Sequence, residues 1–139
     1  MTGTEQGGRR RAWADGFTMI ELLVVVSLVV ILASIGMAQY RNAVTRAQEA
    51  VLKEDLYRMR DVIDQYYADK QEYPQALEDL VTSGYLRAVP KDPFTGSAET
   101  WQLIEAEPDP AQPTAQIGIY NVKSGSEKTA LDGSKYSDW

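Results

Sequence analysis

The sequence predicts an α+β fold in which one very long N-terminal helix carries a small C-terminal head. Residues 17–38 are apolar with a single charge, Glu21, while residues 39–69 contain no Pro or Gly and repeat their apolar side chains with a helical period. The remainder is interrupted by Pro and Gly and holds two short strand-like runs. These observations predict a head with a short helix and a small antiparallel sheet.

The composition excludes most enzymatic chemistry. A chain of 139 residues forms one domain of ordinary size, and it contains no Cys and no His. Disulfides, thiolate metal sites and the usual general base are therefore missing from it. No pair of carboxylates is accompanied by a third, orienting group, so we expect no enzyme and no catalytic cofactor. The net charge of −6 argues against binding to nucleic acid.

The apolar residues 17–38 predict one membrane-spanning segment. At about 1.5 Å per residue they reach about 33 Å, which is enough to cross a hydrocarbon core of about 30 Å. Arg9, Arg10 and Arg11 precede the segment, and basic flanks of this kind stay on the cytoplasmic side. We therefore expect a single-pass protein whose residues 39–139 lie beyond the membrane.

An ordinary secretory signal peptide is the alternative for this N-terminus, with residues 36–38 as its cleavage site. Two features oppose it. The apolar run over 22–38 is longer than the usual signal core of about 7–15 residues, and Glu21 stands at its start. A solitary secreted or membrane-anchored domain would follow from that alternative.

The helix is predicted to continue well past the membrane. Its apolar side chains recur in steps of three and four residues, with a shift by one residue between two stripes. The first stripe comprises Tyr40, Val44, Ala47 and Val51, and the second Leu52, Leu56, Met59, Ile63 and Tyr66. From 17 to 69 the helix would reach about 80 Å. A head of this size cannot cover it, so the first half must contact lipid or other copies of the chain.

The head is predicted from residue 72 onward. Pro74 ends the long helix or begins the next one, and residues 75–83 predict a short helix that stops at Gly84. Strand-like runs at 100–105 and 116–122 form the antiparallel sheet. A stable sheet needs a third strand, whose position the sequence leaves open.

Residues 16–21, Gly-Phe-Thr-Met-Ile-Glu, followed by the apolar run, resemble the start of the type IV pilin and pseudopilin family. The resemblance implies a pilin-like fold, in which 1–16 is a cytoplasmic leader that a prepilin peptidase removes. Cleavage would fall between Gly16 and Phe17, and Phe17 would become the N-methylated first residue. Family members usually carry Pro near the exit of the membrane segment, where this chain has Ala38, and Gly36 could supply a weak point instead.

Glu21 is the residue to which the resemblance assigns filament assembly. A carboxylate inside a membrane span costs about 2.5–3.5 kcal/mol and is rarely kept without a partner. The amine of Phe17 on a neighbouring subunit would supply that partner and set the axial register of a helical homo-oligomer. The alternative is that Glu21 simply lies in the headgroup region beside the basic leader.

The head is similar to that of the major pseudopilins of type II secretion systems. The similarity rests on Tyr73-Pro74, on Pro90-Lys91-Asp92-Pro93 and on residues 120–126. It implies a C-terminal loop that binds a structural calcium ion through carboxylates and carbonyls. The predicted side-chain ligands are Ser126, Glu127, Asp132 and Asp138. The alternative is a solvated acidic turn held by packing of Tyr136 and Trp139.

Together these features predict four segments: the leader 1–16, the membrane and filament-core half-helix 17–38, the periplasmic half-helix 39–71 and the head 72–139. The expected function is that of a structural subunit in a pseudopilus of type II secretion, which drives export of folded proteins. Its expected partners are prepilin peptidase, an inner-membrane assembly platform with its ATPase, and minor pseudopilins. The alternative is a type IV pilin of a surface filament for adhesion, twitching or DNA uptake.

Overall fold

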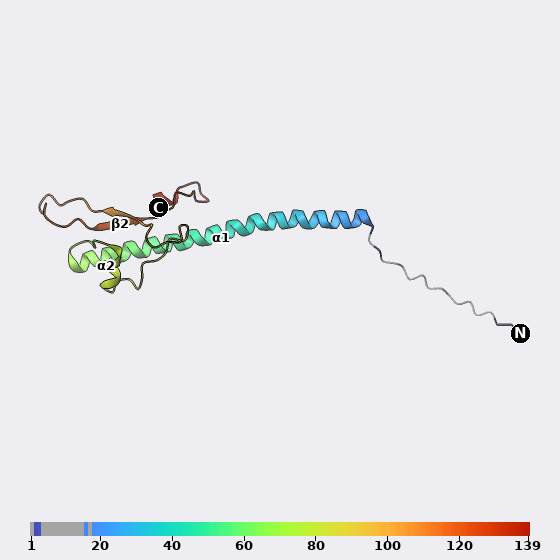
Figure 1. The fold of residues 1–139 in the computed structure, drawn as a ribbon, viewed down its shortest axis with the longest axis horizontal. Helices are drawn as coiled ribbons and strands as arrows, with labels where there is room; N and C mark the ends of the chain where they lie inside the picture. The colour runs from blue at the N-terminus through green and yellow to red at the C-terminus, as the bar shows by residue number, and fades with distance from the viewer. Residues whose placement is uncertain (1, 4–15, 17) are drawn as a thin grey trace. The chain divides into compact units, whose positions relative to one another are not determined.

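The computed structural model describes residues 2–3, 16 and 18–139, and it contains the predicted elements in the predicted order (Figure 1). The predicted elements are the helices α1 (Met19–Lys70) and α2 (Leu77–Thr82) and the strands β1 (Gln102–Glu105) and β2 (Ile119–Lys123). A 3-10 helix that was not predicted, η1 (Tyr136–Asp138), follows them. The chain divides into two compact units, Met1–Gln39 and Tyr40–Trp139. The α+β prediction, a long helix followed by a small head with a short helix and an antiparallel sheet, is confirmed.

The first unit consists, in its described part, mainly of the N-terminal half of α1. Thr18 caps this helix, because its Oγ1 accepts a hydrogen bond of 3.1 Å from the amide of Glu21. The hydroxyls of Ser27 and Ser34 bond back to carbonyls one turn earlier, which satisfies them inside an apolar segment. The helix runs unbroken through Gly36, so that residue does not interrupt it.

The second unit is built on the C-terminal half of α1. The predicted second stripe is confirmed, since all five of its members are buried: Leu52, Leu56, Met59, Ile63 and Tyr66. The first stripe is not buried, because Tyr40, Val44 and Val51 stay between 38% and 66% exposed. The hydrophobic core of the head therefore begins at Leu52.

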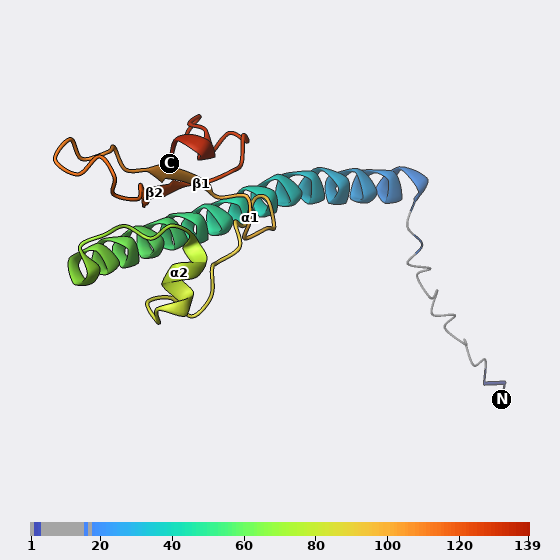
Figure 2. The same cartoon turned by 60° about the vertical axis from the view of Figure 1, so that its left-hand side comes forward.

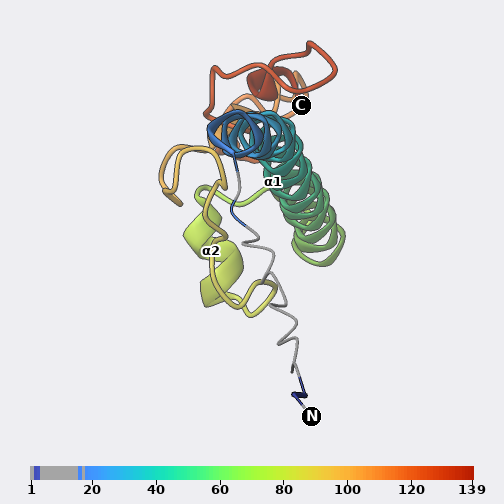
Figure 3. The ribbon, with the colours of Figure 1, turned by 90° about the vertical axis from the view of Figure 1, so that its right-hand side faces the viewer.

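The remaining elements surround this half of α1. Figures 1 and 2 show β1 and β2 running along one side of it, with α2 on another side, and the end-on view of Figure 3 separates α2 from the C-terminal residues. The core between them combines side chains of α1 with others from every part of the head. These others are Leu77, Leu80, Leu86, Trp101, Ile119, Val122, Ala130 and Tyr136.

The sheet has two antiparallel strands, in which Gln102 pairs with Lys123, and its register shifts between Ile104 and Glu105. The prediction of a third strand is wrong for residues 18–139, because the sheet there consists of β1 and β2 alone. Two main-chain groups of β2 are bound by other elements instead. The amide of Ile119 donates to the carbonyl of Pro74 at 2.8 Å, and the carbonyl of Val122 accepts from Arg60.

Two glycines allow the chain to pass very close to itself. A Cβ atom at Gly125 would lie 1.9 Å from the carbonyl oxygen of Thr100, and one at Gly118 would lie 2.5 Å from that of Tyr73. Both distances are far below van der Waals contact, so neither position accommodates a side chain without backbone movement. Gly125 thus fixes the start of the C-terminal segment against the chain before β1.

Candidate functional site

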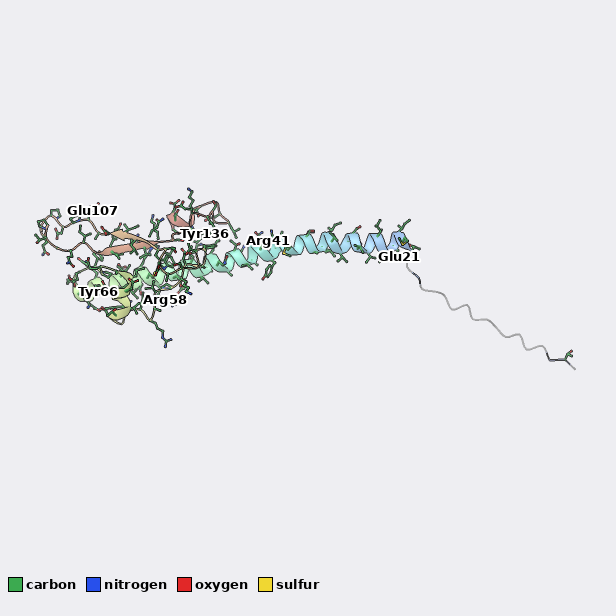
Figure 4. All side chains as sticks on the ribbon, in the orientation of Figure 1. Glu21, Arg41, Arg58, Tyr66, Glu107 and Tyr136 are labelled. Carbon is green, nitrogen blue, oxygen red and sulfur yellow. The ribbon has the colours of Figure 1, made fainter. Side chains whose placement is uncertain are left out.

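The first candidate site is the N-terminal end of α1, where cleavage and assembly were predicted. Gly16 is exposed, and Glu21 lies exposed in the first turn of α1, as Figure 4 shows. Phe17, with its predicted cleavage and methylation, falls outside the described residues. Among residues 18–139, the Glu21 carboxylate has no hydrogen-bond partner.

The helix surface that follows Glu21 is apolar all the way round. Every residue from Met19 to Gln39 is exposed, including Leu22, Ile31 and Ile35, each between 54% and 57% accessible. Within the described part of the chain, α1 is the helix long and apolar enough to cross a membrane. A helix that is apolar on all faces is stable only when lipid or other helices surround it.

The second candidate site is the C-terminal segment, residues 124–139, where calcium was predicted. It is attached to α1 through Glu49, whose Oε1 accepts hydrogen bonds from the amide of Leu131 at 2.9 Å and from the phenol of Tyr136 at 2.8 Å. Tyr136 is 1% exposed and stacks on Phe94, with ring centroids 3.9 Å apart. Burial and the bond to Glu49 raise the pKa of the Tyr136 phenol.

Arg60 makes a second attachment between α1 and the end of the chain. Its Nε donates to Oδ1 of Asn121 at 2.8 Å, and its Nη2 donates to the carbonyl of Val122 at 2.9 Å and to the main-chain oxygen of Trp139. Burial lowers the pKa of this guanidinium from its ordinary value. The indole of Trp139 is held further by Lys53, whose Nζ lies 4.7 Å from the ring centroid.

A third attachment joins the segment to a buried carboxylate. Asp92 is fully buried, and its Oδ1 accepts from the amide of Phe94 at 2.9 Å, while its Oδ2 accepts from the hydroxyl of Ser124 at 2.5 Å. The Ser124 hydroxyl in turn accepts from the amide of Ser126 at 3.2 Å. Both oxygens of Asp92 are therefore satisfied by neutral donors.

The four predicted calcium ligands do not gather into a metal site in this structure. Glu127, Asp132 and Asp138 are exposed, and within the described residues no three carboxylates form a group that could hold a metal ion. The Oγ of Ser126 is buried and accepts from the amide of Lys128 at 3.3 Å. This donor set does not fit a calcium ion as it stands, and calcium binding stays a prediction.

Asp132 also has an unfavourable setting for a cation. Its Oδ1 accepts from the amide and hydroxyl of Ser134 at 2.9 and 2.6 Å, and these bonds lower the pKa of the carboxyl group. It lines a groove of about 410 Å³ together with Lys53, Arg60 and Trp139. Two basic side chains on the same groove repel a divalent cation.

The sequence analysis missed Glu49, Arg60 and Asp92, although a signal exists for the first two. Glu49 stands seven residues before Leu56 and Arg60 stands four after it, so both lie half-buried on the face of α1 that carries the buried stripe. A charged side chain on a buried stripe indicates a specific partner. Their partners could not be named from sequence, because they lie 61 to 87 residues away.

Comparison with known proteins places the chain among the pilin-like proteins. It is 33% identical over 101 residues to the type II secretion system core protein G of Pseudomonas aeruginosa, which covers 61% of this chain and 71% of that protein. It is 29% identical over 111 residues to core protein G of Klebsiella michiganensis, covering 68% of this chain and 76% of the relative. No family model matches the chain, and no solved structure does.

A second kind of relative matches a smaller part of the chain. The type IV major fimbrial protein FimA of Dichelobacter nodosus is 36% identical over 73 residues, which cover 52% of this chain and 47% of that protein. The fold and these similarities define a pilin-like protein, which is not an enzyme. The chain belongs to the family of the type II secretion system core protein G.

Proposed function

We propose that this chain is the structural subunit of a helical pseudopilus in a type II secretion system, and that the filament drives export of folded proteins. The observation that carries the proposal is the similarity to core protein G over most of the chain. The bare apolar half of α1 supports it. Such a helix is stable in lipid before assembly, and its small residues Ser27, Ser34 and Gly36 permit close packing with other helices after assembly.

Maturation by prepilin peptidase forms part of this proposal. Cleavage between Gly16 and Phe17 removes residues 1–16, and methylation then modifies the new amine of Phe17. Because α1 begins at Met19, cleavage at this point leaves the helix intact. The intact mass of protein purified from membranes tests this step: a chain that begins at Phe17 with one added methyl supports it, and a full-length chain overturns it.

Glu21 is proposed to bind the Phe17 amine of a neighbouring subunit. Its carboxylate is exposed in the first helical turn and stands alone among apolar side chains, which makes an opposite charge from outside the chain favourable. Repetition of this contact along a screw axis builds an open filament rather than a closed ring. The remaining proposed partners are the inner-membrane platform with its ATPase and the minor pseudopilins, with the head in the periplasm.

Substitution of Glu21 tests the assembly step. Glu21→Ala should leave the protein in the membrane and abolish filaments in sheared-cell or cross-linking assays. Glu54→Ala is the matched control, since Glu54 is an exposed carboxylate on the same helix outside the apolar segment. Abundant filaments of normal diameter from the Glu21 variant would contradict the proposed pairing.

A type IV pilin of a surface filament is the second candidate, favoured by the match to the fimbrial protein FimA. The two candidates differ in the phenotype of a strain that lacks the gene. Loss of secreted enzymes from the culture medium, with surface filaments unchanged, supports the secretion function. Loss of surface filaments with normal secretion supports the pilin.

A further inference from the structure

The C-terminal segment is attached to the rest of the head at three places, through Glu49, Arg60 and Asp92. We propose that these protein contacts close the segment without a divalent cation, and that Glu49 fixes its part around Leu131 and Tyr136. The proposal follows from the chemistry of the contacts, which differs from that of a metal site at each place.

At Glu49 the direction of the hydrogen bonds is the opposite of what a cation requires. A calcium ion draws several oxygen acceptors to one point. Here one carboxylate oxygen on α1 accepts hydrogen bonds from two donors in the segment, the amide of Leu131 and the hydroxyl of Tyr136. These two residues stand at either end of the turn that contains Asp132 and Gly133. One acceptor thus fixes both ends of the turn, with bonds strengthened by its negative charge.

At Arg60 a guanidinium binds main-chain oxygens that a metal could otherwise use. Its bonds to the carbonyl of Val122 and to the oxygen of Trp139 join α1, β2 and the end of the segment. Lys53 adds a second positive charge 4.7 Å from the Trp139 ring. The end of the segment is therefore held by fixed cationic side chains, in a place where a free cation would be repelled.

At Asp92 both oxygens of a buried carboxylate already accept hydrogen bonds. Asp92 is the buried carboxylate among the described residues, and both its oxygens accept hydrogen bonds within the head. The Ser124 hydroxyl also accepts a hydrogen bond from the amide of Ser126, and the Ser126 hydroxyl accepts one from the amide of Lys128. Ser126, a predicted calcium ligand, thus serves as an internal acceptor.

The first test compares the wild-type, full-length chain in detergent micelles with calcium or with a chelator. About 5 mM calcium exceeds the dissociation constants of weak extracellular sites, which reach about 10⁻³ M. We expect the same thermal midpoint and the same hydrogen exchange over residues 124–139 in both conditions. A higher midpoint in calcium, or slower exchange of these amides, would overturn the proposal.

The second test removes the attachment at Glu49. Glu49→Ala should accelerate amide exchange within residues 128–136 by about tenfold or more, since two bonds to a charged acceptor are lost. Glu54→Ala, five residues further along α1 on its exposed surface, should leave that exchange unchanged. Equal exchange in the two variants would refute the role of Glu49. Should Glu49→Ala fail to fold, Glu49→Gln, which keeps an uncharged acceptor, should give an intermediate acceleration, and wild-type exchange rates in it would refute the same role.

Discussion

The phenol of Tyr136 donates a hydrogen bond of 2.8 Å to Oε1 of Glu49, a residue that precedes it by 87 positions. The bond joins the C-terminal segment to α1, and nearly the whole head lies between the two residues in the sequence. Tyr136 is also 1% exposed and packed between the rings of Phe94 and Trp139. The same side chain therefore belongs both to the hydrophobic core and to the attachment of the segment.

This contact predicts a loss of stability at alkaline pH. Burial and the bond to Glu49 raise the pKa of Tyr136 above its ordinary value of 10.0. A group whose pKa is raised on folding contributes stability that is present below about pH 10 and is lost as the pH rises through the raised pKa. Denaturant midpoints measured from pH 8 to pH 11 should fall less steeply above pH 10 in Tyr136→Phe. Tyr57→Phe, at a 70% exposed position, should behave like wild type. Identical slopes for wild type and Tyr136→Phe would contradict this assignment.

Replacement of Arg60 should destabilise the head even when the positive charge is kept. Arg60→Lys removes the planar fork that reaches Asn121, Val122 and Trp139 together, because an ammonium group cannot match that geometry. We expect a loss of about 1–3 kcal/mol in the free energy of unfolding. Arg58→Lys, which alters only an exposed pair with Glu54, should change it by less than about 0.5 kcal/mol. Equal effects in both variants would show that Arg60 is an ordinary surface residue.

Gly125→Ala should be far more damaging than a glycine substitution in open space. The new Cβ would lie 1.9 Å from the carbonyl of Thr100, so the backbone must move to admit it. A Cβ atom at Gly96 would meet no atom within 4 Å, but Gly96 has a φ of +71°. Gly96→Ala should therefore lower the free energy of unfolding by about 1–2 kcal/mol through strain of the left-handed backbone. Thermal midpoints of the two variants give the comparison. A smaller decrease for Gly125→Ala than for Gly96→Ala would refute the close approach.

Two adjacent residues of α1 test where the core of the head begins. Leu52 is fully buried and Val51 is 51% exposed. Leu52→Ala should therefore lower the free energy of unfolding by about 2–5 kcal/mol through lost burial and a residual cavity. Val51→Ala should change it by no more than about 0.5 kcal/mol. Similar losses in chemical denaturation would mean that the head covers α1 further toward its N-terminus.

The sequence predicts the elements of the fold well, because their signals are local. The spacing of apolar residues by three and four predicts the buried stripe from Leu52 to Tyr66. Pro74 and Gly84, which flank α2, predict its position. The motif at residues 16–21 and the apolar run indicate the family that the similarity to core protein G establishes. Glu21 could be identified as a candidate because a charged residue inside an apolar run is visible in the sequence alone.

The contacts that hold the C-terminal segment could not be predicted, because they depend on which distant groups meet. Neither the pairing of Glu49 with Tyr136 nor that of Asp92 with Ser124 leaves a pattern in the chain near either partner. The third strand was expected from the general instability of two-stranded sheets. In this head the amide of Ile119 binds Pro74 and the carbonyl of Val122 binds Arg60, and their packing on α1 replaces such a strand.

The distribution of core residues along the sequence also governs when the head can fold during its synthesis. Leu52 is among the first residues to enter the core and Tyr136 among the last, so a nascent chain that stops short of Tyr136 lacks both the ring beside Phe94 and the hydroxyl bound to Glu49. Non-local closure of this kind delays folding until the distant partner is present. A chain that stops before Tyr136 therefore still lacks a complete core in its head, while the residues of its apolar helix have all been synthesised.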